Sequence, residues 1–266
     1  MKILILGASG FLGSELYNYF KKKYECYGTQ LSKKNMDLIE IDLTDKNKLK
    51  QLIEKIKPDI ITHCLSTRKE QGLDKISFCE KYPEEAYKIN SETVKNLAEI
   101  FKGKIILFST AAVFSGKRGK YNENDKPNPI NVYGKSKLEG EKELMKHKNF
   151  LLVRTGTLYK DKTGFLYNSL NAGKETECFS NIYDSPIDII SIPRIIEKLI
   201  KINAKGIYHL VGERLSKLRD RFIKEIPELI PNLKVNGALG GQRLSNNINI
   251  SVPDLSSEVL LLELDK

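Results

Sequence analysis

Histidine and cysteine are scarce in this chain of 266 residues, which has three histidines and four cysteines. The histidines show no metal-like spacing. The cysteines, Cys26, Cys64, Cys79 and Cys178, form no C-x-x-C pair. Metal sites usually need such spacings, so the sequence predicts no metal centre. Cys26 and Cys64 lie in apolar, strand-like runs, which predicts small buried side chains rather than reactive thiols.

Long apolar runs are also absent, because no segment is long enough to cross a bilayer. No signal peptide precedes the first apolar strand, so we expect a cytoplasmic protein without a membrane partner. The formal charge is +10, with lysines spread over most of the chain. No aromatic-rich basic stripe accompanies them, which favours a lysine-rich surface over nucleic-acid binding. Attraction of anionic ligands such as phosphates is the milder functional alternative.

The first half of the chain alternates strands with helices. Helical periodicity follows Phe11, and Thr44 is a plausible N-cap for a helix that Pro58 ends. Further helices are predicted over 87–101 and 133–147, and strands over 2–6, 25–29, 37–41, 59–63, 104–108 and 150–154. This order is typical of an α/β fold, a Rossmann-type doubly wound parallel sheet with helices on both faces.

The regular alternation of predicted strands and helices ends after Thr155. Residues 156–190 show no clear period, a helical stripe begins at Ile192, and a strand is predicted over 206–211. A helix over 216–226 and a loop-rich tail from Pro227 follow. We therefore expect a nucleotide-binding domain over 1–155 and a smaller substrate-binding portion over 156–266, with some segments returning to the main sheet.

A glycine-rich turn, GASGFLG, joins the first strand to the first helix. Gly7 permits the tight turn, Gly10 lets the backbone approach a pyrophosphate, and Gly13 lets the helix pack close to the strand. The helix N-terminus adds amide donors and the positive end of its dipole. A dinucleotide-binding loop is predicted, and a glycine-rich turn without a ligand is the alternative.

The end of the second strand bears on the choice of cofactor. NAD enzymes usually place an acid there for the ribose hydroxyls, whereas this chain has Thr29 and Gln30, followed by Lys33 and Lys34. NADP is therefore favoured over NAD, with exposed lysines as the bland alternative. Asp42, after the third strand, could accept a hydrogen bond from the adenine amino group or help start the next helix.

Tyr133 and Lys137 are four residues apart in YGKSK, which places them on one face of a helix. A nearby ammonium lowers the pKa of a phenol, and a tyrosine so placed can give a proton to a carbonyl oxygen or remove one from an alcohol. Thr110, just beyond the fifth strand, could bond the same oxygen. Ser109 is its alternative, and Thr110 could instead only satisfy the strand-end backbone.

These motifs together resemble the extended short-chain dehydrogenase/reductase family, in particular its dTDP-4-dehydrorhamnose reductase group. The resemblance covers roughly residues 1–215 and is carried by GASGFLG, IDLTD, PDIITHC, FSTAAVF, NPINVYGKSKLEGE, LLVRTGTLY and GIYHLVG. It implies an NADPH-dependent reductase of a nucleotide-activated 4-keto-6-deoxy sugar. The catalytic Thr, Tyr and Lys map to Thr110, Tyr133 and Lys137, and Asn90 maps to an asparagine that supports the backbone near the site.

The resemblance also implies the remaining site residues. The cofactor would contact Gly7, Ser9, Gly10, Phe11, Leu12, Gly13, Thr29, Asp42, Leu43, Cys64, Tyr133 and Lys137, and the substrate Ser66, Thr110, Tyr159, Phe179 and Arg214. Arg154 is expected to be an internal strand-end residue. Relatives are often dimers, which makes a homodimer one alternative.

The sequence departs from the group in places. Ala111 stands where close relatives carry Asp, and HCLSTR replaces small alanines after the fourth strand. A dehydratase would need an acid beside Thr110, so Ala111 argues against that activity. A sugar-nucleotide epimerase stays an alternative, as does a binding role like that of the regulatory β subunit of methionine adenosyltransferase, which is similar to these reductases.

Overall fold

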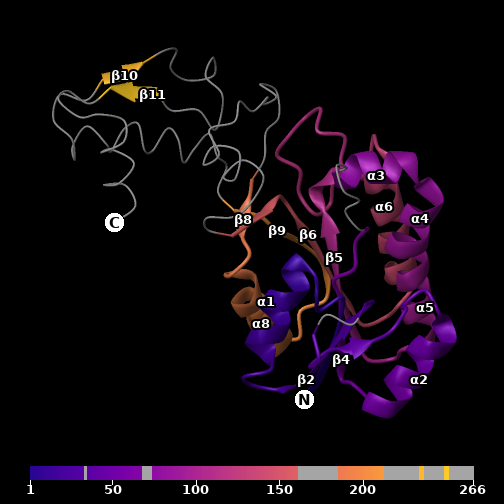
Figure 1. Cartoon of the computed structure of the whole chain (residues 1–266). Coiled ribbons are helices and arrows are strands. Elements are labelled where there is room, and N and C mark those ends of the chain that lie inside the picture. Colours follow the sequence, from indigo (N-terminus) through magenta and orange to yellow (C-terminus); the bar gives the residue numbers. More distant parts are fainter. Residues whose placement is uncertain (33–34, 68–73, 161–184, 213–233, 237–248, 252–266) are drawn as a thin grey trace. The chain divides into compact units, whose positions relative to one another are not determined.

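The computed structural model describes residues 1–32, 35–67, 74–160, 185–212, 234–236 and 249–251, and it contains a seven-stranded parallel sheet (Figure 1). Its strands are β1 (Lys2–Leu6), β2 (Glu25–Gln30), β3 (Ile39–Glu40), β4 (Ile60–His63), β5 (Lys104–Thr110), β6 (Phe150–Thr155) and β9 (Gly206–Leu210). The order is β3-β2-β1-β4-β5-β6-β9, and every neighbouring pair is parallel. The predicted Rossmann-type α/β fold is confirmed.

The strand order reverses between β1 and β4, where chain connections leave in opposite directions. Doubly wound sheets bind ligands outside the carboxyl ends of the strands at such a switch point. The glycine loop follows β1, and residues 64–67 follow β4, so both lie at this edge. Thr110 ends β5, the next strand along.

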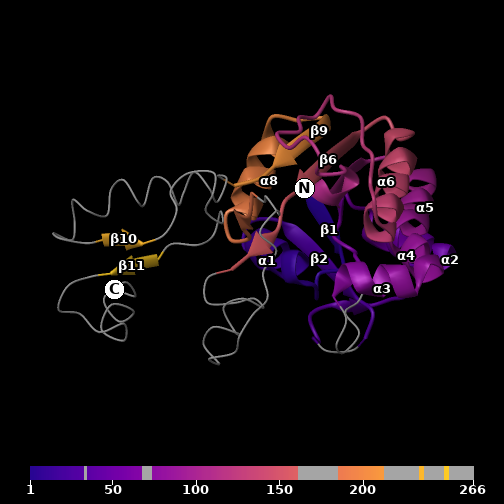
Figure 2. The same ribbon diagram turned by 90° about the horizontal axis from the view of Figure 1, so that it is seen from above.

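Two apolar layers cover the sheet because successive strand side chains point to opposite faces. Ile3 and Ile5 of β1 pack with α1 (Phe11–Phe20) and α8 (Ile192–Lys201), and Leu4 and Leu6 pack toward α2 (Lys46–Ile56) and α5 (Thr93–Ile100). Figures 1 and 2 show α1 and α8 together on one face, with α5 and α6 (Val132–Met145) on the other. The core is thus divided by the sheet that positions the site.

Helix α2 begins one residue later than the capping prediction. Asp45, not Thr44, is its N-cap, and the Asp45 carboxylate accepts hydrogen bonds from the backbone N–H groups of Asn47 and Lys48. The Thr44 hydroxyl instead donates to Asp42 Oδ1, which also accepts from the Thr44 backbone. Both residue types cap helices, so only the turn geometry decided between them.

The predicted helix over 87–101 is three consecutive segments. Helix α4 (Pro83–Tyr87) leads into a π-helical turn, η1 (Lys88–Glu92), which continues into α5. A shorter helix, α3 (Lys75–Lys81), precedes them and was not predicted. π-Turns occur often at functional sites, and this one carries Asn90.

The chain divides into two compact units. One comprises Met1–Gly164 and Ile187–Val211 and includes the sheet, a 3₁₀ turn η2 (Ala111–Val113), and a small sheet of β7 (Leu158–Tyr159) and β8 (Ile187–Asp188). In the other, β10 (Lys234–Asn236) pairs antiparallel with β11 (Asn249–Ser251). Strand β9 and helix α8 belong to the first unit. The predicted boundary at residue 155 stays a prediction, and the predicted helix over 216–226 lies outside the described residues.

Among the described residues, no helix combines the length and apolarity that a bilayer crossing requires.

Candidate active site

The glycine loop has the shape that its spacing predicts. Gly7 adopts a positive φ of 82°, and its N–H donates to the Thr29 hydroxyl at 3.1 Å. A Cβ on Gly13 would lie 2.1 Å from the Gly7 carbonyl oxygen, so only glycine permits this approach. Helix α1 starts at Phe11 with Gly10 as N-cap and no side-chain cap, which leaves the amides of its first turn available to an anion.

The residues at the end of β2 hold this loop and the segment that follows. Thr29 is fully buried, and its carbonyl also accepts from the Ala8 N–H at 2.8 Å. Gln30 is buried too, and its side-chain amide both donates to the Asn35 carbonyl and accepts from the Asn35 N–H. Neither of the two residues that end β2, Thr29 and Gln30, is a carboxylate, as the sequence indicates.

The other predicted cofactor residues differ in exposure. Ser9 and Asp42 are exposed and Phe11 is half exposed, whereas Leu12 and Leu43 are buried in the two core layers. Cys64 is half-buried directly after β4, and burial raises the pKa of its thiol. The Cys64 carbonyl group lies 3.5 Å from where a Cβ of Gly7 would be. Cofactor contact by each of these residues stays a prediction.

Thr110 places its hydroxyl at the end of β5, next to the Tyr133 phenol. It is half-buried, and its Oγ1 accepts from the Ala112 N–H at 3.1 Å, which leaves its own proton for another acceptor. Ser109, the alternative, is buried, and its hydroxyl donates to the Glu141 carboxylate. The structure therefore favours Thr110 over Ser109 as the donor to a reacting oxygen.

Tyr133 stands on the first turn of α6, whose start is firmly capped. Asn131 Oδ1 accepts from the Gly134 N–H at 2.8 Å, and the ring packs against Phe78, Cys79 and Ala86. Burial raises the pKa of the Tyr133 phenol, although the nearby hydroxyls of Thr110 and Ser66 oppose that rise. The structure thus differs from the expectation that the ammonium of Lys137 lowers this pKa. A phenol of raised pKa keeps its proton at neutral pH.

Lys137 lies one turn further along α6 and is buried. Its ammonium donates to the Phe108 carbonyl at 2.8 Å and lies 3.5 Å from the Leu65 carbonyl. Burial, helped by the charge of Lys75, lowers the pKa of Lys137 to about 8. An ammonium has three donors, so at least one is available for a ligand hydroxyl.

Asn90 holds η1 against α6, a contact that the sequence motifs did not reveal. Its side-chain N–H donates to Ser136 Oγ at 3.0 Å, and the Ser136 hydroxyl donates to the Tyr133 carbonyl at 3.0 Å. A Cβ on Gly140 would lie 2.2 Å from the Asn90 carbonyl oxygen, and one on Gly134 would lie 2.2 Å from the Ala112 carbonyl oxygen. Two glycines thus let α6 lie directly on the backbone of η1 and η2.

His63 supports the same turn from β4. The Thr93 hydroxyl donates to the Ile89 carbonyl, so Thr93 Oγ1 accepts from His63 Nε2 at 2.9 Å. Burial, with the charge of Lys137, lowers the pKa of His63 to about 3. This neutral imidazole is a structural link between β4 and the π-turn, and the residue types alone gave no signal of it.

The predicted substrate residues are only partly described. Buried Ser66 Oγ lies near the Tyr133 phenol but makes no well-formed hydrogen bond among the described residues. Tyr159 is half exposed on β7. Phe179 and Arg214 lie outside the described residues. Arg154 is internal, as predicted, and pairs with the Glu141 carboxylate at 2.7 Å.

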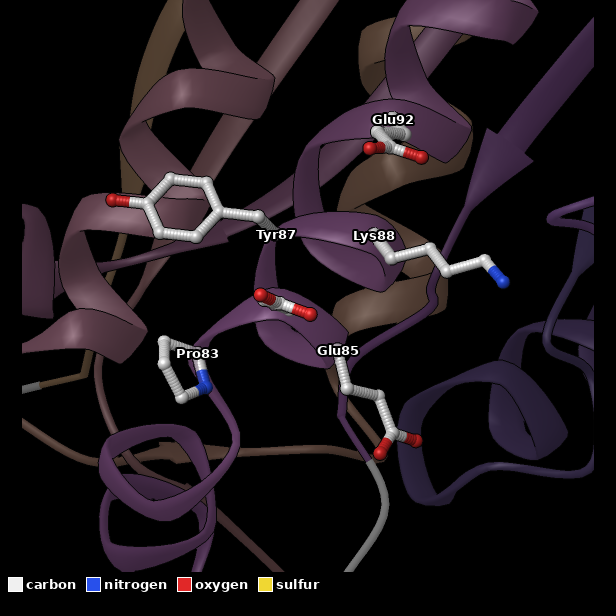
Figure 3. A pocket seen from close by; sticks show the side chains of 6 residues that line it. Pro83, Glu85, Tyr87, Lys88 and Glu92 are labelled. Carbon is white, nitrogen blue, oxygen red and sulfur yellow. The ribbon is translucent and has the colours of Figure 1, made fainter.

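An open hollow elsewhere on this unit contains none of the predicted site residues. It is lined by Pro83, Glu84, Glu85, Tyr87, Lys88 and Glu92, from α4 and η1. Figure 3 shows Tyr87 and Lys88 pointing to opposite sides. An acidic surface hollow of this kind indicates no particular chemistry.

Comparison with known families agrees with this geometry. Residues 1–226 match the model of the RmlD substrate-binding domain. The chain belongs to this RmlD family. Since that match covers the glycine loop, Thr110, Tyr133 and Lys137, all the described catalytic candidates lie within the family's region.

Proteins similar to this RmlD-family chain are named either as dTDP-4-dehydrorhamnose reductases or as the beta subunit of methionine adenosyltransferase 2. A hypothetical dTDP-4-dehydrorhamnose reductase from Sulfolobus tokodaii is 34% identical, with a TM-score of 0.73, over 87% of this chain and 83% of that one. The Bacillus anthracis dTDP-4-dehydrorhamnose reductase, solved in complex with NADP, is 28% identical, with a TM-score of 0.70, over 85% and 80%. Methionine adenosyltransferase 2 subunit beta from Danio rerio is 27% identical over 92% and 81%.

Proposed function

We propose that this RmlD-family chain is an NADPH-dependent reductase of a nucleotide-activated 4-keto-6-deoxy sugar. The observation that carries the proposal is the meeting of Thr110 and Tyr133 hydroxyls at the carboxyl edge of the sheet, with the Lys137 ammonium one helical turn away. The glycine loop lies at the same edge. Likeness to dTDP-4-dehydrorhamnose reductases supports the substrate class.

The residues present fit a dinucleotide. The uncapped first turn of α1 and the glycine loop suit a pyrophosphate, and a strand β2 that ends in Thr29 and Gln30 rather than in an acid suits a 2′-phosphate. NADPH is therefore proposed, with NADH as the alternative. Ser9, Gly10 and Phe11 would face the pyrophosphate, and Lys137 would bond a ribose hydroxyl with its remaining donor.

When bound, the reduced nicotinamide supplies a hydride to the sugar carbonyl carbon. The protein's own residues would bind and protonate the carbonyl oxygen. The Thr110 hydroxyl, which lies beside the Tyr133 phenol, would turn its proton to that oxygen and stabilise developing negative charge. The Tyr133 phenol, protonated because its pKa is raised, then gives the alkoxide its proton. The Thr110 and Ser66 hydroxyls beside the phenol would stabilise the phenolate that forms.

The decisive experiment follows NADPH and NADH oxidation at the nicotinamide absorbance, against a panel of nucleotide-linked 4-keto-6-deoxy sugars. Oxidation with one member identifies the substrate and the preferred cofactor together. No oxidation with any member, while NADPH still binds in calorimetry, would contradict the proposal.

A regulatory role is the second candidate, favoured by the likeness to methionine adenosyltransferase 2 subunit beta. The test is co-expression with the catalytic subunit of a methionine adenosyltransferase from the same source. Stable co-purification, a change in that enzyme's kinetics and no turnover of the sugar panel would support it. An epimerase is the third alternative, and NAD retained through purification would favour it.

A further inference from the structure

Glu141 continues the catalytic face of α6. It follows Lys137 by four residues, as Lys137 follows Tyr133, so the three side chains lie in one row along the helix. Glu141 is fully buried. Its carboxylate accepts from Arg154 Nη2 at 2.7 Å and from Arg154 Nε at 3.2 Å, and the Ser109 hydroxyl donates to its Oε1. This polar cluster of Ser109, Glu141 and Arg154 has no part in the chemistry proposed above.

The cluster joins α6 to two strands at one level of the sheet. Ser109 of β5 and Arg154 of β6 are direct neighbours in the strand register, and Thr110 and Thr155 form the next pair. The Thr155 hydroxyl donates to the Ser109 carbonyl at 3.3 Å. The Glu141 carboxylate is therefore fixed beside Ser109, the residue that precedes Thr110 on β5. Helix α6 connects Glu141 rigidly to Tyr133, two helical turns away.

Arg154 is held from its other side as well. Its guanidinium lies over the Phe114 ring, 5.1 Å from the centroid, and its Nη1 lies 3.4 Å from His209 Nε2 on β9. The Glu123 carboxylate accepts a hydrogen bond from the backbone N–H of His209 at 2.8 Å. Contacts on both sides leave the guanidinium little freedom, so it defines a fixed point for the Glu141 carboxylate.

Stability alone does not account for a buried ion pair of this kind. Removing two charges from water is costly, and well-packed apolar residues of similar volume often stabilise a fold as well or better. What an ion pair with fixed geometry does provide is one preferred placement of the helix on the sheet. Apolar contacts specify such a placement less sharply, because repacked apolar cores lose uniqueness before they lose stability.

We propose that Glu141 and Arg154, acting through Ser109, are positioning residues that keep the Tyr133 phenol within hydrogen-bond reach of Thr110. This inference deepens the proposed function, because it assigns to these residues the alignment of the proton donor with the hydroxyl that binds the reacting oxygen. Small displacements of such groups reduce turnover steeply, by roughly 100-fold per ångström.

Two variants separate positioning from folding. Ser109→Ala removes the tether to β5 and leaves the ion pair intact. The double variant Glu141→Leu with Arg154→Met replaces the pair by apolar side chains, so its melting temperature should stay near that of the wild type. We expect kcat to fall about 10-fold in the first and about 100-fold in the second, with KM changed less than about threefold.

A second readout needs no turnover. The ¹³Cζ resonance of labelled Tyr133, assigned by its loss in Tyr133→Phe, reports the hydrogen bonding of the phenol at neutral pH. Thr110→Val provides the reference spectrum without the Thr110 hydroxyl. We expect the resonance to move toward that reference in Ser109→Ala and in the double variant. Glu197→Gln, which alters a buried carboxylate on the other face, should leave it unchanged.

The outcomes distinguish this inference from the proposed function. If no sugar is turned over by the wild type but the Tyr133 resonance moves as expected, the reductase proposal fails and the positioning inference stands. If the double variant is folded and retains both the wild-type kcat and the wild-type resonance, the cluster is only structural. Should the double variant fail to fold, unchanged kcat and resonance in Ser109→Ala would overturn the inference.

Discussion

Two buried carboxylates, one on each face of the sheet, hold helices in different ways. Glu141 bonds inward to Arg154 and Ser109 on the strands. Glu197 of α8 bonds sideways, accepting from the hydroxyls of Tyr19 and Tyr24 and from the ammonium of Lys23. The first fixes a helix on the sheet and the second fixes α8 to the region of α1.

Because Glu141 and Glu197 bond to different parts of the fold, we expect the two faces of the sheet to differ in what their polar contacts support. On the α6 face, Glu141 bonds to Ser109, the residue that precedes Thr110. The geometry of this contact therefore bears on the proposed chemistry. On the α1–α8 face, the contacts of Glu197 involve the last turn of α1 and the residues just after it, at the opposite end from the glycine loop. Substitutions on the first face should therefore change turnover, and those around Glu197 should change stability.

The largest expected effect tests the α6 face directly. Tyr133→Phe removes the proton donor and keeps the ring packed on Phe78, so we expect kcat to fall at least about 1000-fold. NADPH affinity, measured by calorimetry, should stay nearly unchanged. Wild-type turnover in this variant would remove Tyr133 from the mechanism.

Lys137→Ala should follow in size. It removes the donor proposed for the ribose and the ammonium that bonds the Phe108 carbonyl at the end of β5, so we expect kcat to fall about 100-fold and NADPH to bind more weakly. Lys135→Ala, an exposed lysine on the same helix, is the matched control and should behave as the wild type. An unchanged NADPH affinity in Lys137→Ala would argue against the ribose role.

Gly140→Ala tests how closely α6 lies on η1. Alanine usually stabilises a helix relative to glycine by about 1 kcal/mol. Here the sign should reverse, with a loss of about 2 kcal/mol, because the new Cβ would lie 2.2 Å from the Asn90 carbonyl oxygen. Thermal denaturation measures the change, and Lys142→Ala on the exposed side of α6 serves as the control. A melting temperature above that of the wild type would show that α6 and η1 can separate freely.

The smallest expected effect concerns Glu197, on the α1–α8 face of the sheet. Glu197→Gln weakens four contacts that favour a charged carboxylate, so we expect a loss of about 1–2 kcal/mol at neutral pH with unchanged kcat. Hydrogen bonds from Tyr19 and Lys23 hold the pKa of Glu197 well below its ordinary value. The stabilisation is therefore complete above about pH 5 and is lost as the pH falls further, because the unfolded carboxyl binds a proton first.

Thermal melts of the wild type and Glu197→Gln across pH 3–8 check this behaviour. The difference between their melting temperatures should shrink on the acid side of about pH 4.5. A difference independent of pH, or a reduced kcat in the variant, would break the separation between the two faces.

Local patterns predicted most of the sheet, because strand signals depend on short apolar runs. Strand Lys2–Leu6 has the expected bounds, the helix Phe11–Phe20 begins at the expected residue, and the long helix predicted over 133–147 is shifted by one or two residues. The helix cap at Asp45 and the π-turn at 88–92 were missed. Both depend on local turn geometry that residue types do not specify, since Thr44 and Asp45 can each cap a helix.

The site divides in the same way. Thr110, Tyr133 and Lys137 were found from spacing along single elements. The roles of Ser109 and Glu141 were not, because Glu141 meets Ser109 only once β5, β6 and α6 have been assembled. Likewise, the raised pKa of Tyr133 follows from burial by α3, a helix that the sequence pattern did not predict.

The π-turn at Lys88–Glu92 has a consequence for how this region tolerates changes in length. A π-turn contains one residue more than the α-helix it interrupts, and each residue turns an α-helix by about 100°. Deleting one residue at 88 or 89 would therefore make the helix regular, and α5 would keep its place. Asn90 would rotate away from Ser136, and the Asn90 carbonyl would no longer face Gly140. A shorter chain would thus keep the fold while α6 lost its contacts with Asn90.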